Sequence, residues 1–296
     1  CSTITAAACI TEPPSKGITW STWFPNPEVR TKVRQVKVHR RGIGFVANAM
    51  AVLALLAVPA AMAQERNASD ILRAMSDYVG SQQSIALSYD SSIEVITPQL
   101  EKIQFTSSGE MQLQRPDKLK ARRTGGYSDV ELFFDGNKVS VFAHEVNAYS
   151  QFEGPVNLDQ LVEVLRAGHG VALPGADLLL SSSHDALVAG VLEEKYMGHG
   201  VIDGRLCEHL AFRNFDTDWQ LWVETGEQPI PRKLVITSKT MNGAPQYSVN
   251  IKQWKVGQEL APGIFIFDPP AGAELLSPDA LIEFDELPQS HMEEAQ

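Results

Sequence analysis

Segments in which apolar and polar residues alternate recur along most of this chain, and they constrain its fold more than any other feature. One such segment extends from Ile85 to Tyr89, and another extends from Trp219 to Glu224. A period of two places successive side chains on opposite faces, as in a β-strand with one buried face. Asp135-Gly136 and Asn242-Gly243 lie between such segments, and these dipeptides favour tight hairpin turns. The pattern therefore predicts a long antiparallel sheet.

Two blocks of these segments are expected to form the strands. The first block, from residue 85 to residue 152, contains five or six sequential antiparallel strands. The second is expected to form strands at residues 196–202, 206–213, 219–224, 232–239, 246–254 and 264–267. A sheet this long either closes or curls, and helices then cover its concave side.

A short amphipathic helix is expected before the first block, at residues 69–79. Ile71, Leu72, Met75 and Val79 would lie on one stripe of it. Ser69 or Asp70 is the expected N-cap, and Gly80 is expected to end the helix.

Two more helices are expected between the strand blocks. The first begins after Asn157, a good N-cap, and repeats apolar residues at helical spacing to Leu165; the second is expected at residues 185–192. Residues 157–192 thus lie where a lid could cover the sheet. The predicted fold class is α+β, mainly antiparallel β, with a curved half-barrel sheet of about 10–11 strands and a helical lid.

A secretory signal is expected near the start of the chain. Basic residues cluster from Lys32 to Arg41, an apolar run extends from Phe45 to Ala60, and Ala61-Met62-Ala63 has the small residues that a signal peptidase recognises. Export with cleavage after Ala63 is therefore predicted. The alternative is a retained anchor, although the run is shorter than the ~20 residues that span a membrane.

The signal divides the chain into four expected parts. Residues 1–31 are expected to be an upstream extension, either disordered or translated from a misplaced start. Residues 32–63 form the signal peptide, and residues 64–287 form one half-barrel domain. Residues 288–296 are polar and acidic, so they are expected to be a disordered tail.

The charge and cysteine content of residues 64–296 exclude some classes of partner. This part has 18 Lys and Arg against 34 Asp and Glu. Nucleic acid is therefore not an expected partner, since phosphate binding needs clustered basic residues, and any membrane contact is expected to be transient. Cys207 is the one cysteine of this part, so no internal disulfide is expected and the hydrophobic core must stabilise the domain. The domain is expected to be a monomer.

No motif in residues 64–296 indicates catalysis, so the protein is not expected to be an enzyme or to need a cofactor. Cys207 and His209 share a strand face, but two residues are too few for a metal site, and a buried thiol is the simpler interpretation. The run from Ser181 to Asp185 suggests a hydrolase only weakly, because it lacks a Gly-x-Ser-x-Gly elbow; Ser183 or Asp185 is expected to cap a helix instead.

Four charged residues lie near the ends of adjacent predicted strands, namely Arg213, Asp218, Arg232 and Lys233. They could pair across neighbouring strands or meet the polar head of a ligand. Cross-strand pairing is the favoured interpretation, because opposite charges on neighbouring strands are common in sheets.

A set of motifs in the second block resembles a known family. They are Asp203-Gly204-x-x-Cys207-x-His209-Leu210-Ala211-Phe212-Arg213, Asp218-Trp219-Gln220-x-Trp222, Pro229-x-Pro231-Arg232-Lys233-x-Val235-Ile236-Thr237, Pro245-Gln246-Tyr247 and Phe267-x-Pro269-Pro270-x-Gly272-Ala273. Together they resemble a family of predicted periplasmic proteins of unknown function from Gram-negative bacteria. That family is similar in fold to the lipoprotein carriers of the LolA, LolB and LppX type. The resemblance implies a periplasmic location and an apolar cavity for acyl chains.

The leading hypothesis is a non-enzymatic periplasmic protein that binds or carries an acyl chain, a lipid or a lipidated protein. The alternative is an interaction or envelope-assembly module whose interior is filled by its own side chains; an esterase is the least favoured. Trp219 and Trp222 lie on opposite faces of one strand, so one of them either lines a cavity or packs in the core. The ligand-lining candidates are Leu113, Phe133, Val141, Leu161, Leu165, Trp219, Trp222, Ile236, Tyr247 and Trp254.

Overall fold

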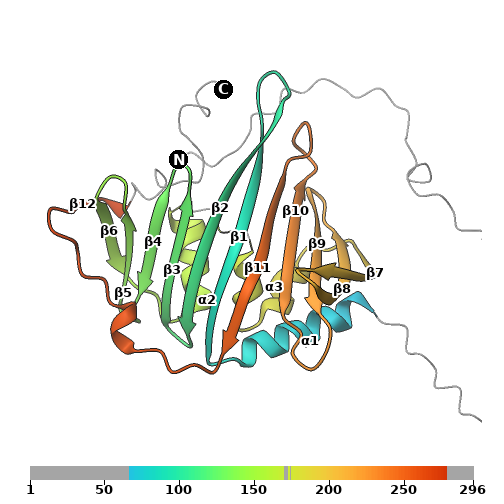
Figure 1. Cartoon of the computed structure of the whole chain (residues 1–296), viewed down its shortest axis with the longest axis horizontal. Coiled ribbons are helices and arrows are strands. Elements are labelled where there is room, and N and C mark those ends of the chain that lie inside the picture. The colour runs from blue at the N-terminus through green and yellow to red at the C-terminus, as the bar shows by residue number, and fades with distance from the viewer. Residues whose placement is uncertain (1–66, 170–172, 174, 279–296) are drawn as a thin grey trace, which may run out of the picture. The chain divides into compact units, whose positions relative to one another are not determined.

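The computed structural model describes residues 67–169, 173 and 175–278. One curved sheet of twelve strands forms the body of this part of the chain (Figure 1). The first six strands are β1 (Ser84–Ile96), β2 (Lys102–Gln114), β3 (Lys118–Gly125), β4 (Asp129–Phe134), β5 (Lys138–Ala143) and β6 (Ala148–Glu153). The other six are β7 (Glu193–Ile202), β8 (Arg205–Arg213), β9 (Thr217–Glu224), β10 (Pro231–Ser238), β11 (Gln246–Val256) and β12 (Glu274–Leu276).

The chain builds the sheet outward from its centre and then inward from the far edge. The strand order is β12-β6-β5-β4-β3-β2-β1-β11-β10-β9-β8-β7, so β11 returns to lie beside β1. Each neighbouring pair is antiparallel except β12 and β6, which are parallel. The sheet stays open between β12 and β7, and this confirms the predicted fold class of a curved antiparallel sheet with few helices.

Two parts of the strand prediction were wrong. Residues 264–267 do not form a strand: Pro262–Phe265 form a short 3-10 helix, η4, whose Phe265 is buried. The strand β12 was missed, because its three residues are too few to display a period.

Helix α1 (Ala68–Ser81) begins one residue earlier and ends two residues later than expected. Its N-cap is Asn67, whose side chain accepts a hydrogen bond from the Ser69 backbone N–H at 3.1 Å. Ser69 and Asp70 are therefore not the caps, and Gly80 lies within the helix. The buried stripe of α1 includes Leu72, Met75 and Val79.

The Asn67 cap gives a testable contribution to stability. Asn67→Ala is expected to lower the free energy of unfolding by about 1 kcal/mol, because the Ser69 N–H loses its acceptor. Urea denaturation of residues 64–296 measures this change, and Asn67→Asp is the control that keeps the acceptor. Equal stability of Asn67→Ala and the wild type would contradict the assignment of the cap.

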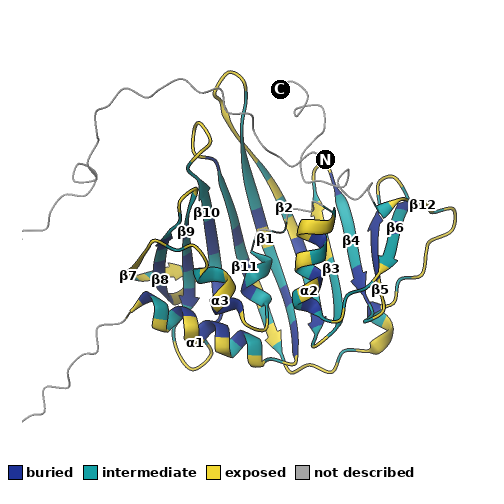
Figure 2. Cartoon of the chain, turned by 180° about the vertical axis from the view of Figure 1, so that it is seen from behind, coloured by how far each residue is buried: buried dark blue, intermediate teal, exposed yellow. Residues whose placement is uncertain are grey.

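The lid between the strand blocks lies on one face of the sheet (Figure 2). It contains α2 (Leu158–Glu163), which continues as a π-helical turn, η2 (Val164–Gly168), and then η3 (Ala176–Leu179) and α3 (Ser183–Val188). Asn157 caps α2 as predicted, because its side chain accepts from the Gln160 N–H at 2.9 Å. The third helix was placed two residues too late: α3 begins at Ser183, after the N-cap Ser182.

The core lies between the helices and the face of the sheet that they cover, which we call the inner face. Its buried side chains come from both layers, namely Ala68, Leu72, Met75, Val79, Ile85, Leu87, Leu113, Phe134, Val139, Leu158, Leu161, Leu165, Leu178, Leu210, Phe212, Trp219, Leu221, Val223, Leu234, Val249 and Ile251. Within the described residues, no helix is both long and apolar enough to cross a membrane.

Candidate ligand site under the lid

A small apolar cavity of about 130 Å³ lies between the inner face and the lid, and we call it the lid pocket. Its floor consists of Leu87, Tyr89, Met111, Arg123, Tyr247, Val249 and Ile251, from β1, β2, β3 and β11. Its roof consists of Leu173, Gly175, Ala176, Leu178 and Leu179. The central strands thus supply one wall and a single short segment of the lid supplies the other.

Gly175 allows the lid to approach the sheet closely. Its φ of +85° lies in the left-handed region, which side chains disfavour. A Cβ at this position would lie 3.3 Å from Leu234 Cδ2 and 3.7 Å from Val249 Cγ1. Gly175 therefore lets the chain turn at the start of η3, and it lets the backbone of the roof approach the side chains of the sheet closely.

Arg115, at the end of β2, fastens the lid to the rest of the domain. Its Nη2 donates to the Leu179 carbonyl of the roof at 2.7 Å, and its Nε donates to the Gln82 carbonyl after α1 at 3.1 Å. Burial lowers the pKa of Arg115, and the nearby Asp159 carboxylate opposes that effect. We call these contacts of Arg115 the lid latch.

Two further sets of polar contacts order the lid, one between two parts of the lid and one between the lid and α1. Asp159 on α2 accepts hydrogen bonds from the Ser181 N–H, at 3.0 Å, and from the Ser181 hydroxyl. Ser76 on α1 accepts from the His184 N–H at 2.7 Å, and its hydroxyl lies 2.8 Å from that of Ser183. The lid is therefore attached to α1 and to the end of β2 through a few side chains.

Eight of the ten predicted lining residues lie on the inner face or in the lid, but only Tyr247 lines the lid pocket. Leu113, Val141, Leu161, Leu165 and Trp219 are buried, and Ile236, Tyr247 and Trp254 pack partly buried against the core. Trp219 stacks on Phe212 with ring centroids 3.9 Å apart. Trp219 therefore packs in the core and does not line the lid pocket, which were the two roles considered for a tryptophan of this strand.

Phe133 and Trp222, two of the predicted lining residues, do not line the lid pocket. Phe133 lies on the outer face, with its ring centroid 5.3 Å from that of Phe267. Trp222 is stacked on His209 at 4.2 Å, also away from the lid. In both strands the neighbouring residue occupies the inner face, so alternation directs these rings outward.

The floor residues that the prediction missed are Leu87, Tyr89, Met111, Arg123, Val249 and Ile251, and all the roof residues were missed. Leu87 and Tyr89 carry the same alternation that identified their strand. Choosing them as lining residues requires knowing which strands lie at the centre of the sheet, beneath the lid. Local periodicity does not contain that information.

Cys207 is fully buried, and its environment is that of a core thiol. Burial raises the pKa of the Cys207 thiol, and the nearby Glu224 carboxylate acts in the same direction. A raised pKa keeps the thiol protonated and unreactive. The described residues contain no cluster of three His, Cys, Asp or Glu side chains placed to hold a metal ion.

This burial predicts the reactivity of Cys207. A thiol reagent at pH 8 is expected to label the native domain at least ~100-fold more slowly than the urea-unfolded domain, because labelling requires opening of the fold. Absorbance of the released thiolate measures both rates. Lys255→Cys adds an exposed thiol as a control that should react at once, and fast labelling of the wild type would contradict the burial of Cys207.

The remaining motifs have structural roles. Ser183 and Asp185, the expected caps of α3, both lie within the helix, whose N-cap is Ser182; the Ser183 hydroxyl bonds to Ser76 instead. The charged residues pair across strands as favoured: Arg213 Nε lies 3.9 Å from Asp218 Oδ1, and Arg232 Nε donates to Glu224 Oε2 at 2.7 Å. Lys233 lies over the Trp222 ring at 5.7 Å. None of them lines the lid pocket.

Comparisons with known proteins give one family match and several distant structural likenesses. A family model described as "Predicted periplasmic protein (DUF2092)" matches residues 68–277. No curated protein matches the chain.

Among solved structures, the lipoprotein LppX of Mycobacterium tuberculosis is 14% identical with a TM-score of 0.40, and the match covers 63% of this chain and 94% of LppX. LprF of Mycobacterium bovis is 13% identical with a TM-score of 0.41, covering 66% of this chain and 94% of LprF. A chain of the MucA/MucB complex of Pseudomonas aeruginosa is 12% identical with a TM-score of 0.37, and the match covers 68% of this chain and 61% of that one. Likeness at this level does not extend to function.

Proposed function

The chain belongs to the DUF2092 family of predicted periplasmic proteins, as its motifs predicted, and from this premise we propose that residues 64–296 form a non-enzymatic binder of hydrophobic ligands in the periplasm. The observation that carries the proposal is the lid pocket, an apolar cavity between a lid and the inner face of an open sheet. Cleavage after Ala63 is part of the proposal, because residues 1–66 lie outside the described structure.

Ligand entry in this proposal requires the lid to lift. The lid pocket holds about 130 Å³, whereas ligand pockets usually measure ~300–1,000 Å³. The roof side chains Leu178 and Leu179 occupy space that an acyl chain would take. When the roof lifts, Leu178 and Leu179 lose their contacts with the floor, and the ligand makes contacts with the floor in their place. Each methylene of the ligand that is buried there contributes ~0.8 kcal/mol to binding.

Uptake of a fatty acid by the delipidated domain tests the proposal. Palmitate is expected to bind with a dissociation constant of about 20 µM or tighter, since burial of half its carbons supplies about 6.4 kcal/mol. Displacement of the neutral probe N-phenyl-1-naphthylamine measures the affinity, and native mass spectrometry measures the stoichiometry, expected to be one.

A variant with a filled pocket provides the control. Ala176→Phe places a ring beneath the roof and should reduce probe binding without unfolding the domain. Reproducible absence of bound lipid in the purified wild type, together with no uptake of probe or palmitate, would defeat the proposal.

A second candidate is an interaction module with a filled interior, and the small volume of the lid pocket favours it. Its partner would add a strand to an exposed sheet edge. The strand β7 is such an edge, and its Met197 and Val201 side chains are exposed. This candidate predicts no palmitate uptake, and a proline at His199 on β7 should abolish partner binding.

A further inference from the structure

A hollow of about 570 Å³ lies on the outer face of the sheet, on the side opposite the lid, and we propose that it binds a neutral oligosaccharide. We call it the outer hollow. Five neighbouring strands line it, in the order β3, β2, β1, β11 and β10, and most of the lining residues carry a hydroxyl or an amide. The outer hollow and the lid pocket share no lining residue, so this inference does not depend on the proposed function.

Five of the lining residues form one row across the strands, and we call it the outer row. Backbone pairing places its members opposite one another in the order Thr124, Ser108, Asp90, Asn250 and Lys233. Asn250 lies between Val249 and Ile251 of the lid-pocket floor, so alternation directs the row to the outer face. Neighbouring strands lie ~4.8 Å apart, so the row presents polar groups over about 19 Å. This length suits a ligand of several linked rings.

The outer hollow exists because short side chains replace long ones at the outer row. Beside the row, Arg122 on β3 lies opposite Glu110 on β2, and such long charged side chains are usual on an exposed sheet face. The next outward pair of the same two strands is Thr124 and Ser108. Small hydroxyl residues leave space above the sheet while they keep donors and acceptors at its surface.

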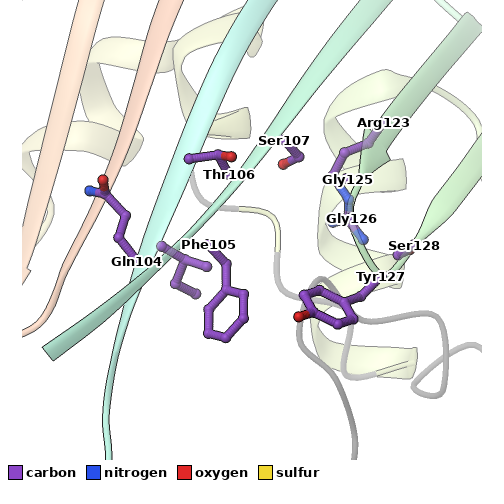
Figure 3. A pocket seen from close by; sticks show the side chains of 10 residues that line it. Gln104, Phe105, Thr106, Ser107, Arg123, Gly125, Gly126, Tyr127 and Ser128 are labelled. Carbon is purple, nitrogen blue, oxygen red and sulfur yellow. The ribbon is translucent and has the colours of Figure 1, made fainter. Parts of the chain in front are cut away.

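Further polar side chains border the outer row and are already ordered by hydrogen bonds. The hydroxyls of Ser92 and Ser248 lie 2.8 Å apart, and Gln104 Nε2 donates to Ser92 Oγ at 3.3 Å. Figure 3 shows Gln104 and Thr106, which line the outer hollow, on the side of β2 opposite Phe105. Binding groups that are held in place before a ligand arrives lose little conformational entropy on binding.

Asn250, near the middle of the outer row, supplies an independent indication of a ligand. Its side-chain Oδ1 is buried and has no hydrogen-bond partner in the part of the chain that the structure describes. A buried acceptor without a partner is uncommon in native structures. The neighbouring Asp90, in contrast, accepts from Ser108 Oγ at 2.7 Å and lies 3.6 Å from Lys252 Nζ. A ligand hydroxyl that donates to Asn250 would satisfy the remaining acceptor.

An aromatic pair continues the outer row on β9 and β8. Trp222 lies opposite Lys233, and His209 lies opposite Trp222. The two rings stack with centroids 4.2 Å apart, and His209 Nε2 lies 3.0 Å from Gln220 Oε1. A sugar ring has C–H groups that pack on aromatic rings and hydroxyls that bond to polar side chains. A row that joins hydroxyls and amides to an aromatic end therefore matches a saccharide.

The charges of the outer row favour a neutral ligand. Asp90 and Lys233 lie on either side of Asn250, so the row carries one charge of each sign. An anion would be repelled by Asp90 and by the acidic surplus of residues 64–296. A cation would meet Lys233, and Asp90 already has Lys252 as its counter-charge. A sugar hydroxyl both donates and accepts, so it suits a row that contains both kinds of group.

Titration calorimetry of residues 64–296 with a panel of trisaccharides tests the outer hollow. The neutral members are N-acetylated chitotriose, maltotriose and cellotriose, and trigalacturonate is the anionic one. At least one neutral member is expected to bind with a dissociation constant of about 1 mM or tighter, because each hydrogen bond exchanged with water contributes little net free energy. Trigalacturonate is expected to bind at least ~5-fold more weakly than that member, because its carboxylates meet Asp90.

Three variants locate the binding. Ser108→Phe fills the outer hollow from an exposed position and should weaken binding at least ~10-fold. Asn250→Ala removes the unpaired acceptor and should weaken binding about 3- to 10-fold. Gln112→Phe is the matched control, because it places the same ring in the outer series of β2 but outside the outer hollow, and it should change the affinity less than about 2-fold.

The outcomes each decide one part of the inference. If no neutral trisaccharide binds the wild type, the saccharide site is overturned, and if trigalacturonate binds most tightly, the neutral assignment is overturned. Equal affinities of Ser108→Phe, Gln112→Phe and the wild type would place binding elsewhere on the domain and overturn the site. Should Ser108→Phe not fold, Asn250→Ala decides in its place.

A separate measurement identifies the source of the saccharide and keeps this inference apart from the proposed function. Co-sedimentation of the wild type, but not of Ser108→Phe, with purified peptidoglycan would support the site and identify a cell-wall glycan. Trisaccharide binding without co-sedimentation would support the site and identify a free oligosaccharide. Palmitate uptake should be the same in Ser108→Phe and the wild type, because the outer hollow lies across the sheet from the lid pocket.

Discussion

Glu224→Ala is expected to lower the free energy of unfolding by about 3 to 5 kcal/mol, because it leaves the Arg232 guanidinium buried without its counter-charge. Arg232 is only 3% exposed, and its Nη2 lies 2.5 Å from Glu224 Oε2. Arg205 also donates to Glu224, at 2.9 Å, but from a half-exposed position. Urea denaturation followed by tryptophan fluorescence measures the loss.

Two comparison variants isolate the buried charge as the cause. The double variant Glu224→Ala with Arg232→Met should recover at least about 1 kcal/mol, because it removes both charges. Asp129→Ala breaks the more exposed pair with Arg122 and should cost no more than about 1 kcal/mol. If Glu224→Ala lowered the free energy of unfolding no more than Asp129→Ala does, the claim that a buried, unpaired Arg232 strongly destabilises the fold would be wrong.

The same pair sets a pH dependence. Burial acts to raise the pKa of Glu224, but hydrogen bonds from Arg232 and Arg205 outweigh it, so the pKa lies below its ordinary value of 4.5. A carboxyl whose pKa is lower in the folded state stabilises the fold above its unfolded pKa and loses that contribution as the pH falls through the folded pKa. Wild-type stability should therefore fall below pH 4.5, more steeply than that of Glu224→Ala.

Alternation predicted the strands well because each strand has one buried face, and it failed where a choice of face was needed. Along β9 it separated Trp219 from Trp222 without telling which ring meets the lid. Both rings find apolar or stacked neighbours, Trp219 on Phe212 and Trp222 on His209. Neither ring of β9 is therefore exposed enough to reveal the outer face of this strand, and only the position of the helices decides it.

Long-range pairing and the cavities were beyond the reach of local patterns. The partner of β12 is β6, more than a hundred residues earlier in the chain. Arg123 did leave a signal: Lys118, Lys120 and Arg122 form the outer series of β3, so a charge at position 123 falls in the inner series. That break in the period marks the one charged residue among the described residues that line the lid pocket.

Arg115→Met is expected to speed ligand exchange by about 10- to 150-fold, because losing the charge-assisted bond to the Leu179 carbonyl removes about 1.5 to 3 kcal/mol from the closed state of the lid. Methionine retains the apolar stem while it removes the donors. The stopped-flow rate of N-phenyl-1-naphthylamine uptake by the delipidated domain measures the change. The equilibrium affinity should rise as well, since ligand no longer competes with the latch.

Arg166→Met is the matched control for the latch. Arg166 pairs with Asp177 at 3.1 Å, but both residues belong to the lid, and neither fastens it to the sheet. Its loss should therefore leave the uptake rate within about 2-fold of the wild type, because exposed pairs contribute little. Arg115 also bonds to the Gln82 carbonyl after α1, so the stability of each variant is measured in parallel. Equal uptake rates for Arg115→Met, Arg166→Met and the wild type would mean that lifting of the roof does not limit entry, and the latch would have only a structural role.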